Sequence, residues 1–199
     1  MAEEKKFYGK YRGVVVSVLD PERRARILVQ VPVVYKDSVS GWAEPCLPLV
    51  GLRAGLVALP QVGAAVWVEF EQGDPERPIW SGGFWQMGAC PSTLVPLQTL
   101  LQTATGHSIL IDDTPGTGGI SLTTLTGDTL KLSTATGALL QTVVGHKIEI
   151  NPAGITLQTV TGNKLMITDA GIELSTSQGA SVMLAGNTVL LNKDGLVVM

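Results

Sequence analysis

Residues 137–179 read GALLQTVVGHKIEINPAGITLQTVTGNKLMITDAGIELSTSQG, and this stretch decides the fold. Its six glycines, from Gly137 to Gly179, follow one another at intervals of 8, 9, 8, 9 and 8 residues. The double repeat is therefore 17 residues long. A fixed short period is typical of repeat folds, in which one structural unit stacks on the next. We expect one strand and one corner in each unit.

Aliphatic residues alternate with polar residues inside each unit. After Gly145, for example, Ile148 and Ile150 enclose Glu149. Side chains two positions apart on a strand point to the same face, so each strand has one apolar and one polar face. The predicted aliphatic pairs are Ile109/Ile111, Ile120/Leu122, Leu130/Leu132, Ile148/Ile150, Ile155/Leu157, Leu165/Ile167, Ile172/Leu174, Val182/Leu184 and Leu196/Val198.

The same pattern extends from Gly106 to Gly195 with one insertion. The interval from Gly106 to Gly127 is 21 residues, four more than the double repeat, and we assign the surplus to a surface loop at residues 114–119. Each glycine of the repeat is expected at a corner with positive φ, which other residues avoid.

The balance of energies favours several chains over one. A fully buried aliphatic side chain contributes about 1.5–3 kcal/mol, whereas ordering each residue costs about 1–2 kcal/mol of backbone entropy. Two aliphatic residues per strand do not offset that cost in an isolated chain. We therefore expect an intertwined trimeric β-helix (β-prism), in which the aliphatic pairs of three chains meet around a threefold axis.

The first part of the chain has a different composition. All ten aromatic residues lie between Phe7 and Trp85, whereas the first threonine is Thr93. Short alternating stretches, such as residues 26–31 and 64–70, end at turn residues and show no helical periodicity. About five such strands favour a small closed barrel, which leaves no free sheet edge.

The change in composition predicts two domains. Residues 1–86 form the barrel domain, residues 87–100 a linker, and residues 101–199 the repeat domain. In the barrel, Val66 and Val68 are expected to share the core-facing side of one strand.

Composition excludes several classes of function. A formal net charge of -3 removes the electrostatic argument for binding nucleic acid or an anionic membrane. Cys46 and Cys90 are too few for a disulfide scaffold, and we expect them to be buried or in the linker. The first seven residues contain no apolar signal core, so ordinary secretion is not indicated. Residues 49–68 are apolar but interrupted by glycine and proline, which predicts buried strands rather than a membrane span.

Several short motifs of the first 85 residues occur in a fixed order. They are Gly13-Val14-Val15, Asp20-Pro21, Arg26-Ile27-Leu28-Val29-Gln30-Val31-Pro32, Gly41-Trp42-Ala43, Leu59-Pro60-Gln61-Val62-Gly63 and Gly73-Asp74-Pro75 with Arg77 and Pro78, followed by Gly82 and Trp85. This set resembles the OB barrel of the phage baseplate assembly protein V (gpV) spike family, a module that also occurs in the VgrG spike of type VI secretion systems. The glycine-punctuated second half is similar to the spike β-helix of that family.

The resemblance implies an all-β chain with an N-terminal OB-fold domain and a C-terminal trimeric β-helix needle. It implies a structural central spike of a contractile injection machine (phage tail, tailocin or related particle), which is not an enzyme and holds no cofactor. The implied partners are two further copies in a homotrimer, a baseplate hub protein at the OB-domain end, the inner tube through that hub, and a PAAR-like protein at the C-terminal tip. The target envelope is contacted only transiently. Assembly is expected in the producer cytoplasm, in the baseplate of the particle.

The last residues, Leu196-Val197-Val198-Met199, lie within a strand pattern. Short phage spikes of the family often end in a His-x-His iron site, whereas this chain has only His107 and His146. Either the end folds inward on its own axis or another protein covers it. We expect a PAAR-like protein to bind Leu196, Val198 and Met199.

The sequence shows no set of residues for catalysis or metal binding. The two histidines follow corner glycines, so we expect them to face solvent, with an axial ion site as the alternative. Asp112 and Asp113 fit the polar flank of a loop better than a hydrolytic pair. Asp128, Asp169 and Asp194 recur, but the calcium β-roll motif is absent. The alternatives are a spike-borne enzyme or carrier acting on cell wall or glycan, and an OB protein binding single-stranded nucleic acid through aromatics that we expect to fill the core.

Overall fold

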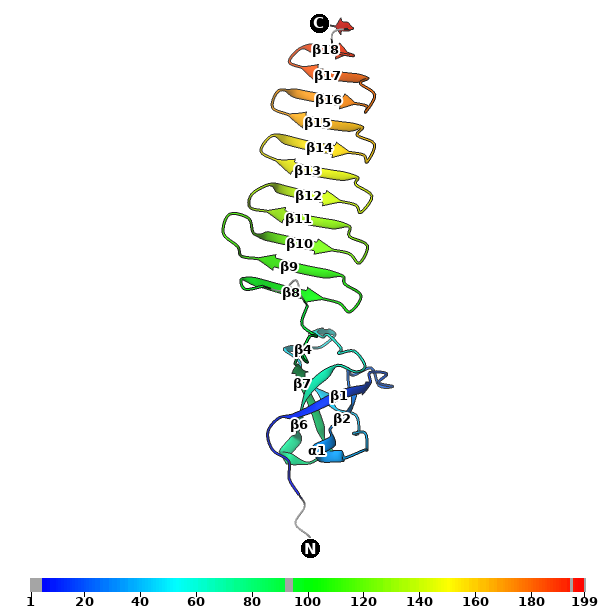
Figure 1. Ribbon diagram of the computed structural model, residues 1–199, viewed down its shortest axis with the longest axis vertical. Coiled ribbons are helices and arrows are strands. Elements are labelled where there is room, and N and C mark those ends of the chain that lie inside the picture. Colours follow the sequence, from blue (N-terminus) through cyan, green and yellow to red (C-terminus); the bar gives the residue numbers. More distant parts are fainter. Residues whose placement is uncertain (1–4, 92–94, 194, 199) are drawn as a thin grey trace. The chain divides into compact units, whose positions relative to one another are not determined.

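The computed structural model of the protein describes residues 5–91, 95–193 and 195–198. The chain divides into two compact units, of which the first ends at Pro91. Strands β1–β7 belong to the first unit and strands β8–β19 to the second (Figure 1). Among the described residues, helix is confined to α1 (Pro32–Tyr35) and the 3₁₀ turn η1 (Glu71–Gly73). The predicted all-β class is confirmed.

The first unit is a five-stranded sheet that closes on itself. Its order is β2-β1-β6-β7-β3, with β3 parallel to β7 and the other neighbours antiparallel. Isolated bridges from Ile27 to Ala43 and from Gln30 to Val39 join the β2 segment to the chain before β3. These bridges close the sheet into the predicted barrel. The strands are β1 (Tyr11–Ser17), β2 (Leu28–Gln30), β3 (Glu44–Pro45), β6 (Ala65–Phe70) and β7 (Pro78–Gly83).

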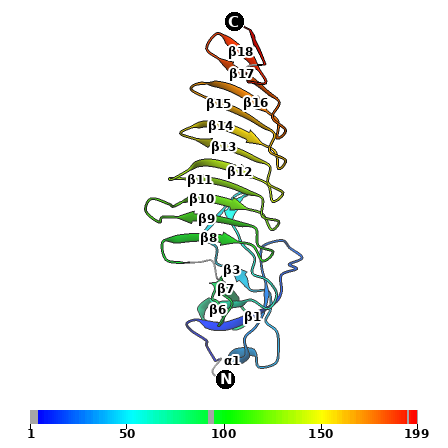
Figure 2. The same cartoon turned by 45° about the horizontal axis from the view of Figure 1, so that its top comes forward.

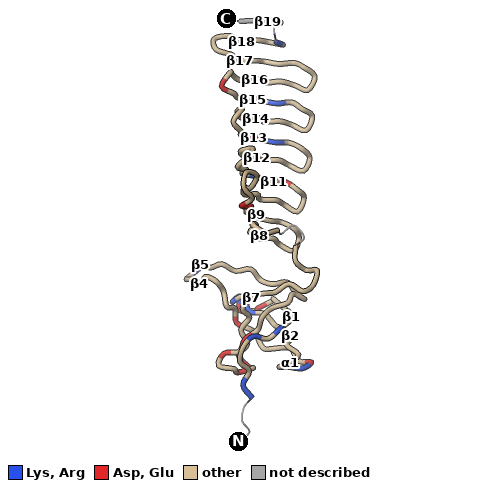
Figure 3. The backbone as a smooth tube through the Cα atoms, turned by 60° about the vertical axis from the view of Figure 1, so that its left-hand side comes forward, with Lys and Arg blue, Asp and Glu red and all other residues tan. Residues whose placement is uncertain are grey.

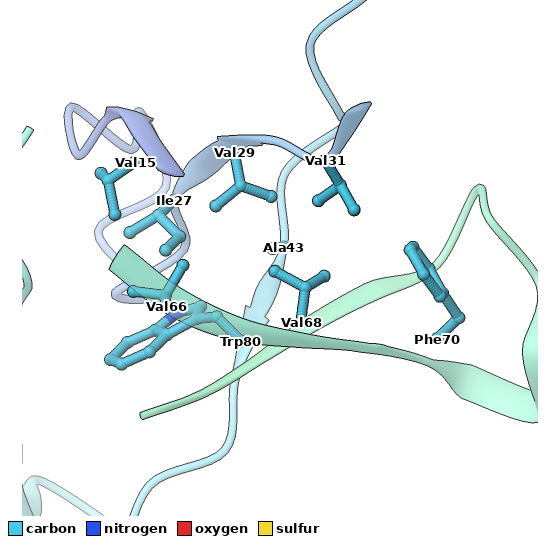
Figure 4. Close-up of a cluster of buried hydrophobic side chains, with 9 residues drawn as sticks. All are labelled: Val15, Ile27, Val29, Val31, Ala43, Val66, Val68, Phe70 and Trp80. Carbon is cyan, nitrogen blue, oxygen red and sulfur yellow. The ribbon is translucent and has the colours of Figure 1, made fainter. Parts of the chain in front are cut away.

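The core of the first unit lies inside this barrel (Figure 4). Val66 and Val68 of β6 are fully buried, as the alternation of that strand predicts. Gly13 of β1 faces them so closely that an added Cβ would lie 2.8 Å from Cγ2 of Val68. The full cluster is Val15, Ile27, Val29, Val31, Ala43, Val66, Val68, Phe70 and Trp80.

Residues 49–68 are not all buried, which corrects the sequence prediction. Strands β4 (Leu49–Gly51) and β5 (Ala54–Leu56) pair only with each other among the described strands. Every residue of both strands is exposed, and Leu52 at the turn is 96% exposed. The prediction of buried strands is correct only from Ala65 onward. An isolated two-stranded ribbon has no second layer against which to bury its apolar side chains.

The second unit is one antiparallel sheet of twelve strands, each paired with its neighbours in the sequence. Figures 1 and 2 show the strands stacked in chain order. Among the described residues, the hydrogen bonds of this sheet therefore join strands of the same chain. The strands are β8 (Gln98–Gln102), β9 (Ser108–Asp112), β10 (Gly119–Thr123), β11 (Thr129–Ser133), β12 (Gly137–Gln141), β13 (Lys147–Asn151), β14 (Gly154–Gln158), β15 (Lys164–Thr168), β16 (Gly171–Ser175), β17 (Ser181–Ala185), β18 (Thr188–Leu191) and β19 (Leu196–Val198).

The repeat glycines form two kinds of corner. At one edge of the sheet, a longer corner such as Thr142–His146 contains a bond from the Gly145 amide to the Thr142 carbonyl, and Gly145 has φ 100°. We call these the long corners. At the other edge, glycine begins a strand, and a Cβ on Gly171 would lie 2.0 Å from the carbonyl oxygen of Leu184. We call these the short corners.

Two sequence predictions for the repeat concern its insertion and the corner at Gly195. The expected insertion is present, because the connection between β9 and β10 is longer than the other short corners. Near the predicted corner at Gly195, Asn192 and Lys193 have positive φ.

Candidate functional site, an apolar face for assembly

One face of the second unit is a continuous apolar surface, which we call the apolar face. The strand register places Ile120 opposite both Ile111 and Leu132, and places Leu122 opposite both Ile109 and Leu130. The same two columns continue through the sheet. The first column is Leu101, Ile109, Leu122, Leu130, Leu140, Ile148, Leu157, Leu165, Leu174, Val182, Leu191 and Leu196, and the second is Ile111, Ile120, Leu132, Ala138, Ile150, Ile155, Ile167, Ile172, Leu184 and Val189.

The apolar face is uncovered in the single chain. Its exposed side chains range from 37% exposed at Ile155 to 59% at Leu101. Nearly all the predicted aliphatic pairs lie on this face, which confirms the period-two prediction. The pair Leu196/Val198 is confirmed only at Leu196, because the side chain of Val198 lies outside the described residues. So large an exposed apolar surface on a folded chain marks an interaction site.

The opposite face carries the charges of the described strands of this sheet, and charged residues are sparse along β8–β19 (Figure 3). On β13, Glu149 accepts hydrogen bonds from Lys147 and Asn151, each at 2.9 Å. The Lys147 ammonium holds the pKa of Glu149 below its usual range. These partners leave this face compatible with water.

Two hollows on the apolar face repeat the same composition. One, of about 360 Å³, is lined by first-column residues such as Ile109 and Leu122 together with His107 and Asp128. Its equivalent further along the sheet, about 450 Å³, contains His146 at the position of His107. The long corners therefore border the first aliphatic column.

The sequence-predicted candidates for metal binding and catalysis do not come together. His107 and His146 are exposed corner residues, as expected, and the described residues contain no group of three His, Cys, Asp or Glu side chains suited to a metal. Asp112 accepts hydrogen bonds from Thr114, which lower its pKa, and from Gln98. It therefore helps to fix the loop that follows β9.

Other candidates fall differently. Cys46 and Cys90 are both exposed, so the prediction of a buried thiol is wrong for Cys46, which lies directly after β3. Asp194 and Met199 lie outside the described residues. Among the described strands, β19 pairs with β18 alone, and Leu196 is 54% exposed. The proposed tip set of Leu196, Val198 and Met199 therefore stays a prediction.

The Asp20 motif of the first unit fixes the conformation of the loop before β2. The Asp20 carboxylate accepts bonds from the backbone amides of Glu22 and Arg24 and from the Arg26 guanidinium at 2.7 Å. Arg26 is 8% exposed and lies over the Trp42 ring, 5.7 Å from its centroid. The guanidinium holds the pKa of Asp20 far below its usual range. The motif is thus fully used in fixing the loop before β2.

The Gly73-Asp74-Pro75 motif is also structural. Asp74 accepts a bond from the amide of Glu76 at 2.9 Å, and the Tyr35 hydroxyl donates to the carbonyl of Pro75 at 2.5 Å. Burial raises the pKa of Tyr35 to about 12. The motif therefore ties the β6–β7 turn to the last residue of α1.

The expectation that aromatic residues fill the core is correct only in part. Phe70 and Trp80 are buried, whereas Trp85 is exposed. The Arg12 guanidinium lies 5.5 Å from the Trp67 ring and 4.8 Å from the Phe84 ring. The sequence already indicates that Trp67 lies outside the core, because Trp67 alternates along β6 with the buried Val66 and Val68.

Comparison with protein families matches both units. Residues 11–85 match the type VI secretion system/phage-baseplate injector OB domain, and residues 98–137 and 137–197 match the phage baseplate V C-terminal trimerisation domain. The chain belongs to the phage baseplate V family. A search of curated proteins found no match.

Membership of the baseplate V family explains the uncovered surface. Its trimerisation domain coincides with strands β8–β19, which supports a homotrimer. Both domains are structural, which is consistent with a chain that is not an enzyme and supports a structural spike of an injection system, placed in a phage-tail-like baseplate. Among the described residues, no helix is long and apolar enough to cross a membrane.

Proposed function

We propose that three copies of this chain form the central spike that pierces the target envelope when a contractile injection machine fires. The apolar face carries this proposal. It runs along the trimerisation domain, and two aliphatic columns per chain are uncovered until other copies bury them. Burying both columns of three chains forms a dry aliphatic core, whose stabilisation grows with the apolar area removed from water.

The sheet is suited to a mechanical task. Its consecutive strands are joined alternately by long and short corners, and each strand is hydrogen-bonded along its length to its neighbours. Consecutive strands of such a meander are about 4.8 Å apart in the hydrogen-bonding direction. Force applied along the stack is therefore carried by backbone hydrogen bonds and the side-chain core, with no long flexible connection between strands.

The remaining partners follow from the family resemblance. A baseplate hub binds the OB-fold domain and connects it to the inner tube, and sheath contraction drives the assembly into the envelope. A PAAR-like protein covers the outer edge of β19, where no described strand pairs. The trimer is assembled in the producer cytoplasm, and contact with the envelope lasts only for the injection.

The piercing function is tested in particles that carry Ile167→Asp, which puts a carboxylate on the apolar face. Dye entry into target cells is measured after sheath contraction. Lys164→Ala, on the other face of the same strand, is the control. We expect normal dye entry with the control and none with Ile167→Asp. Full dye entry by Ile167→Asp particles that retain the chain contradicts the proposal.

The tip partner is tested by deleting residues 196–199. The shortened trimer should stay folded, because β8–β18 keep both columns, but it should no longer copurify with a PAAR-like protein produced alongside it. Retention of the tip protein by the shortened chain excludes binding at β19.

A peptidoglycan zymogram of the intact chain should show no clearing, which separates a mechanical spike from one that digests the wall.

A further inference from the structure

The residue that follows the glycine of four successive long corners makes the same contact with the next long corner. His107 Nδ1 accepts the backbone N–H of Leu125 at 3.2 Å, and Asp128 Oδ1 accepts that of Val143 at 2.9 Å. The corners then continue in this way up the sheet. His146 Nδ1 accepts the amide of Val160 at 3.3 Å, and Asn163 Oδ1 accepts that of Ser177 at 2.9 Å. We call His107, Asp128, His146 and Asn163 the corner ladder.

The corner ladder joins each long corner to the one before it. Each donor is the second residue of its corner, and it also packs on the preceding glycine. For example, a Cβ placed on Gly127 would lie 3.6 Å from Cγ2 of Val143. These corners border the apolar face, where His107 and Asp128 line one hollow and His146 and Asn163 line the other. Leu125 and Val160 are exposed, so an amide that loses its acceptor here gives up one net hydrogen bond.

The four acceptors differ in how they respond to acid. A neutral imidazole can accept at Nδ1, but a protonated one donates from both nitrogens and then meets the amide as donor against donor. Histidine is the side chain that ordinarily changes charge between pH 5 and 8. Asn163 does not titrate, and the amide of Val143 helps to hold the pKa of Asp128 below its usual range. Asp128 therefore remains an acceptor throughout that interval.

The charged surroundings of the two histidines are different. Asp128 is the titratable side chain that shares the hollow of His107. Lys147 and Lys164 line the hollow of His146. The two sites need not open at the same pH, but the geometry at each requires a neutral imidazole.

We propose that acid opens the corner ladder selectively at His107 and His146, so that the corners at Leu125 and Val160 loosen while those at Val143 and Ser177 stay closed. This pH-sensitive device is built from alternating titratable and non-titratable acceptors in one repeated position. It goes beyond the proposed function and does not depend on it.

Hydrogen–deuterium exchange of the intact protein, resolved to single amides, tests the proposal between pH 8 and pH 5. Rates are normalised to the intrinsic exchange rate at each pH. We expect protection at Leu125 and Val160 to fall by about three- to tenfold in acid, the range that one net hydrogen bond predicts. Protection at Val143 and Ser177 should not change.

His107→Asn and His146→Asn are the matched variants, because Asn163 already occupies the equivalent position. His146→Asn should abolish the acid effect at Val160 and leave it at Leu125, and His107→Asn should do the reverse. A pH-independent Leu125 and Val160 in the wild type overturns the proposal. So does an equal loss at all four amides, or an acid effect that survives in the double variant.

Discussion

At the scale of single residues, Asp20 shows how one carboxylate fixes a loop. It accepts bonds from three backbone amides and from the Arg26 guanidinium, all within the seven residues from Asp20 to Arg26. The guanidinium is in turn covered by Trp42. Because these bonds require the ionised carboxylate, the loop depends on the charge of Asp20.

We expect Asp20→Asn to lower the midpoint of thermal unfolding of the first unit at pH 7. The folded-state pKa of Asp20 is lowered, so its contribution to stability is present above about pH 4 and is lost as the pH falls further. The difference between variant and wild type should therefore shrink in acid. Glu22→Gln, at an exposed partner of Arg26, is the control and should change the midpoint little. A difference that grows in acid contradicts this account.

Single residues were predictable where strand parity applies. Val66 and Val68 lie in the core as the alternation predicts, and the same parity places the half-buried Trp67 outside the core, against Arg12. The corner ladder was not predictable, because His107 accepts a hydrogen bond from Leu125, which lies 18 residues further along the chain. Only the folded register brings these residues together.

At the scale of elements, the two kinds of corner place different demands on glycine. Long corners need only the positive φ, and Gly179 has open space around its Cα. Short corners also need the space, because the backbone of the next strand approaches the glycine, as Leu184 of β17 approaches Gly171 of β16.

Gly171→Ala should therefore destabilise the second unit more than Gly179→Ala. In both variants alanine has to adopt a positive φ, which costs an L-residue about 1–2 kcal/mol. Gly171→Ala adds overpacking of about 1–3 kcal/mol, because its methyl group meets the carbonyl of Leu184. Thermal unfolding of the two variants measures the difference. Equal shifts contradict the distinction between the corners.

The two faces of β14 give a second prediction at this scale. Leu157→Lys introduces a charge on the apolar face and should dissociate or unfold the trimerisation domain, because an unpaired buried charge is very costly. Thr156→Lys places the same side chain on the other face, opposite Glu149, and should be nearly silent. Size-exclusion chromatography with thermal unfolding compares them, and similar behaviour contradicts the assignment of the faces.

The elements were predictable to different depths. The glycine period predicts most strands of the repeat, because each inward pair belongs to its own strand. It does not reveal β12, whose pair contains Ala138, or β18, which lies outside the regular spacing. Residues 49–56 were misjudged because hydropathy measures the preference for burial and not whether a second layer exists to provide it.

At the scale of the whole molecule, the property to measure is the number of chains in the assembly. Light scattering should give three times 21.0 kDa, about 63 kDa. Folding and association are expected to be inseparable, because the aliphatic columns have no cover within the chain. A well-folded monomer at micromolar concentration contradicts the trimeric spike.

The domain boundaries remain a prediction that proteolysis can test. Cleavage within residues 87–97, between β7 and β8, should release a folded barrel and a trimeric sheet. Circular dichroism of both products should show β-structure with little helix. Rapid digestion of the released barrel would mean that it does not fold by itself.

Because the strand register repeats, the length of the sheet can be changed in fixed steps. Each described strand of this sheet is hydrogen-bonded to the strands next to it in the sequence, and the same two columns recur along the sheet. Removing or duplicating one 17-residue double repeat changes the number of strands by two and leaves every other pairing intact. At about 4.8 Å per strand, each such step alters the reach by about 10 Å. Genetic duplication can thus adjust this chain to envelopes of different thickness without the invention of a new contact.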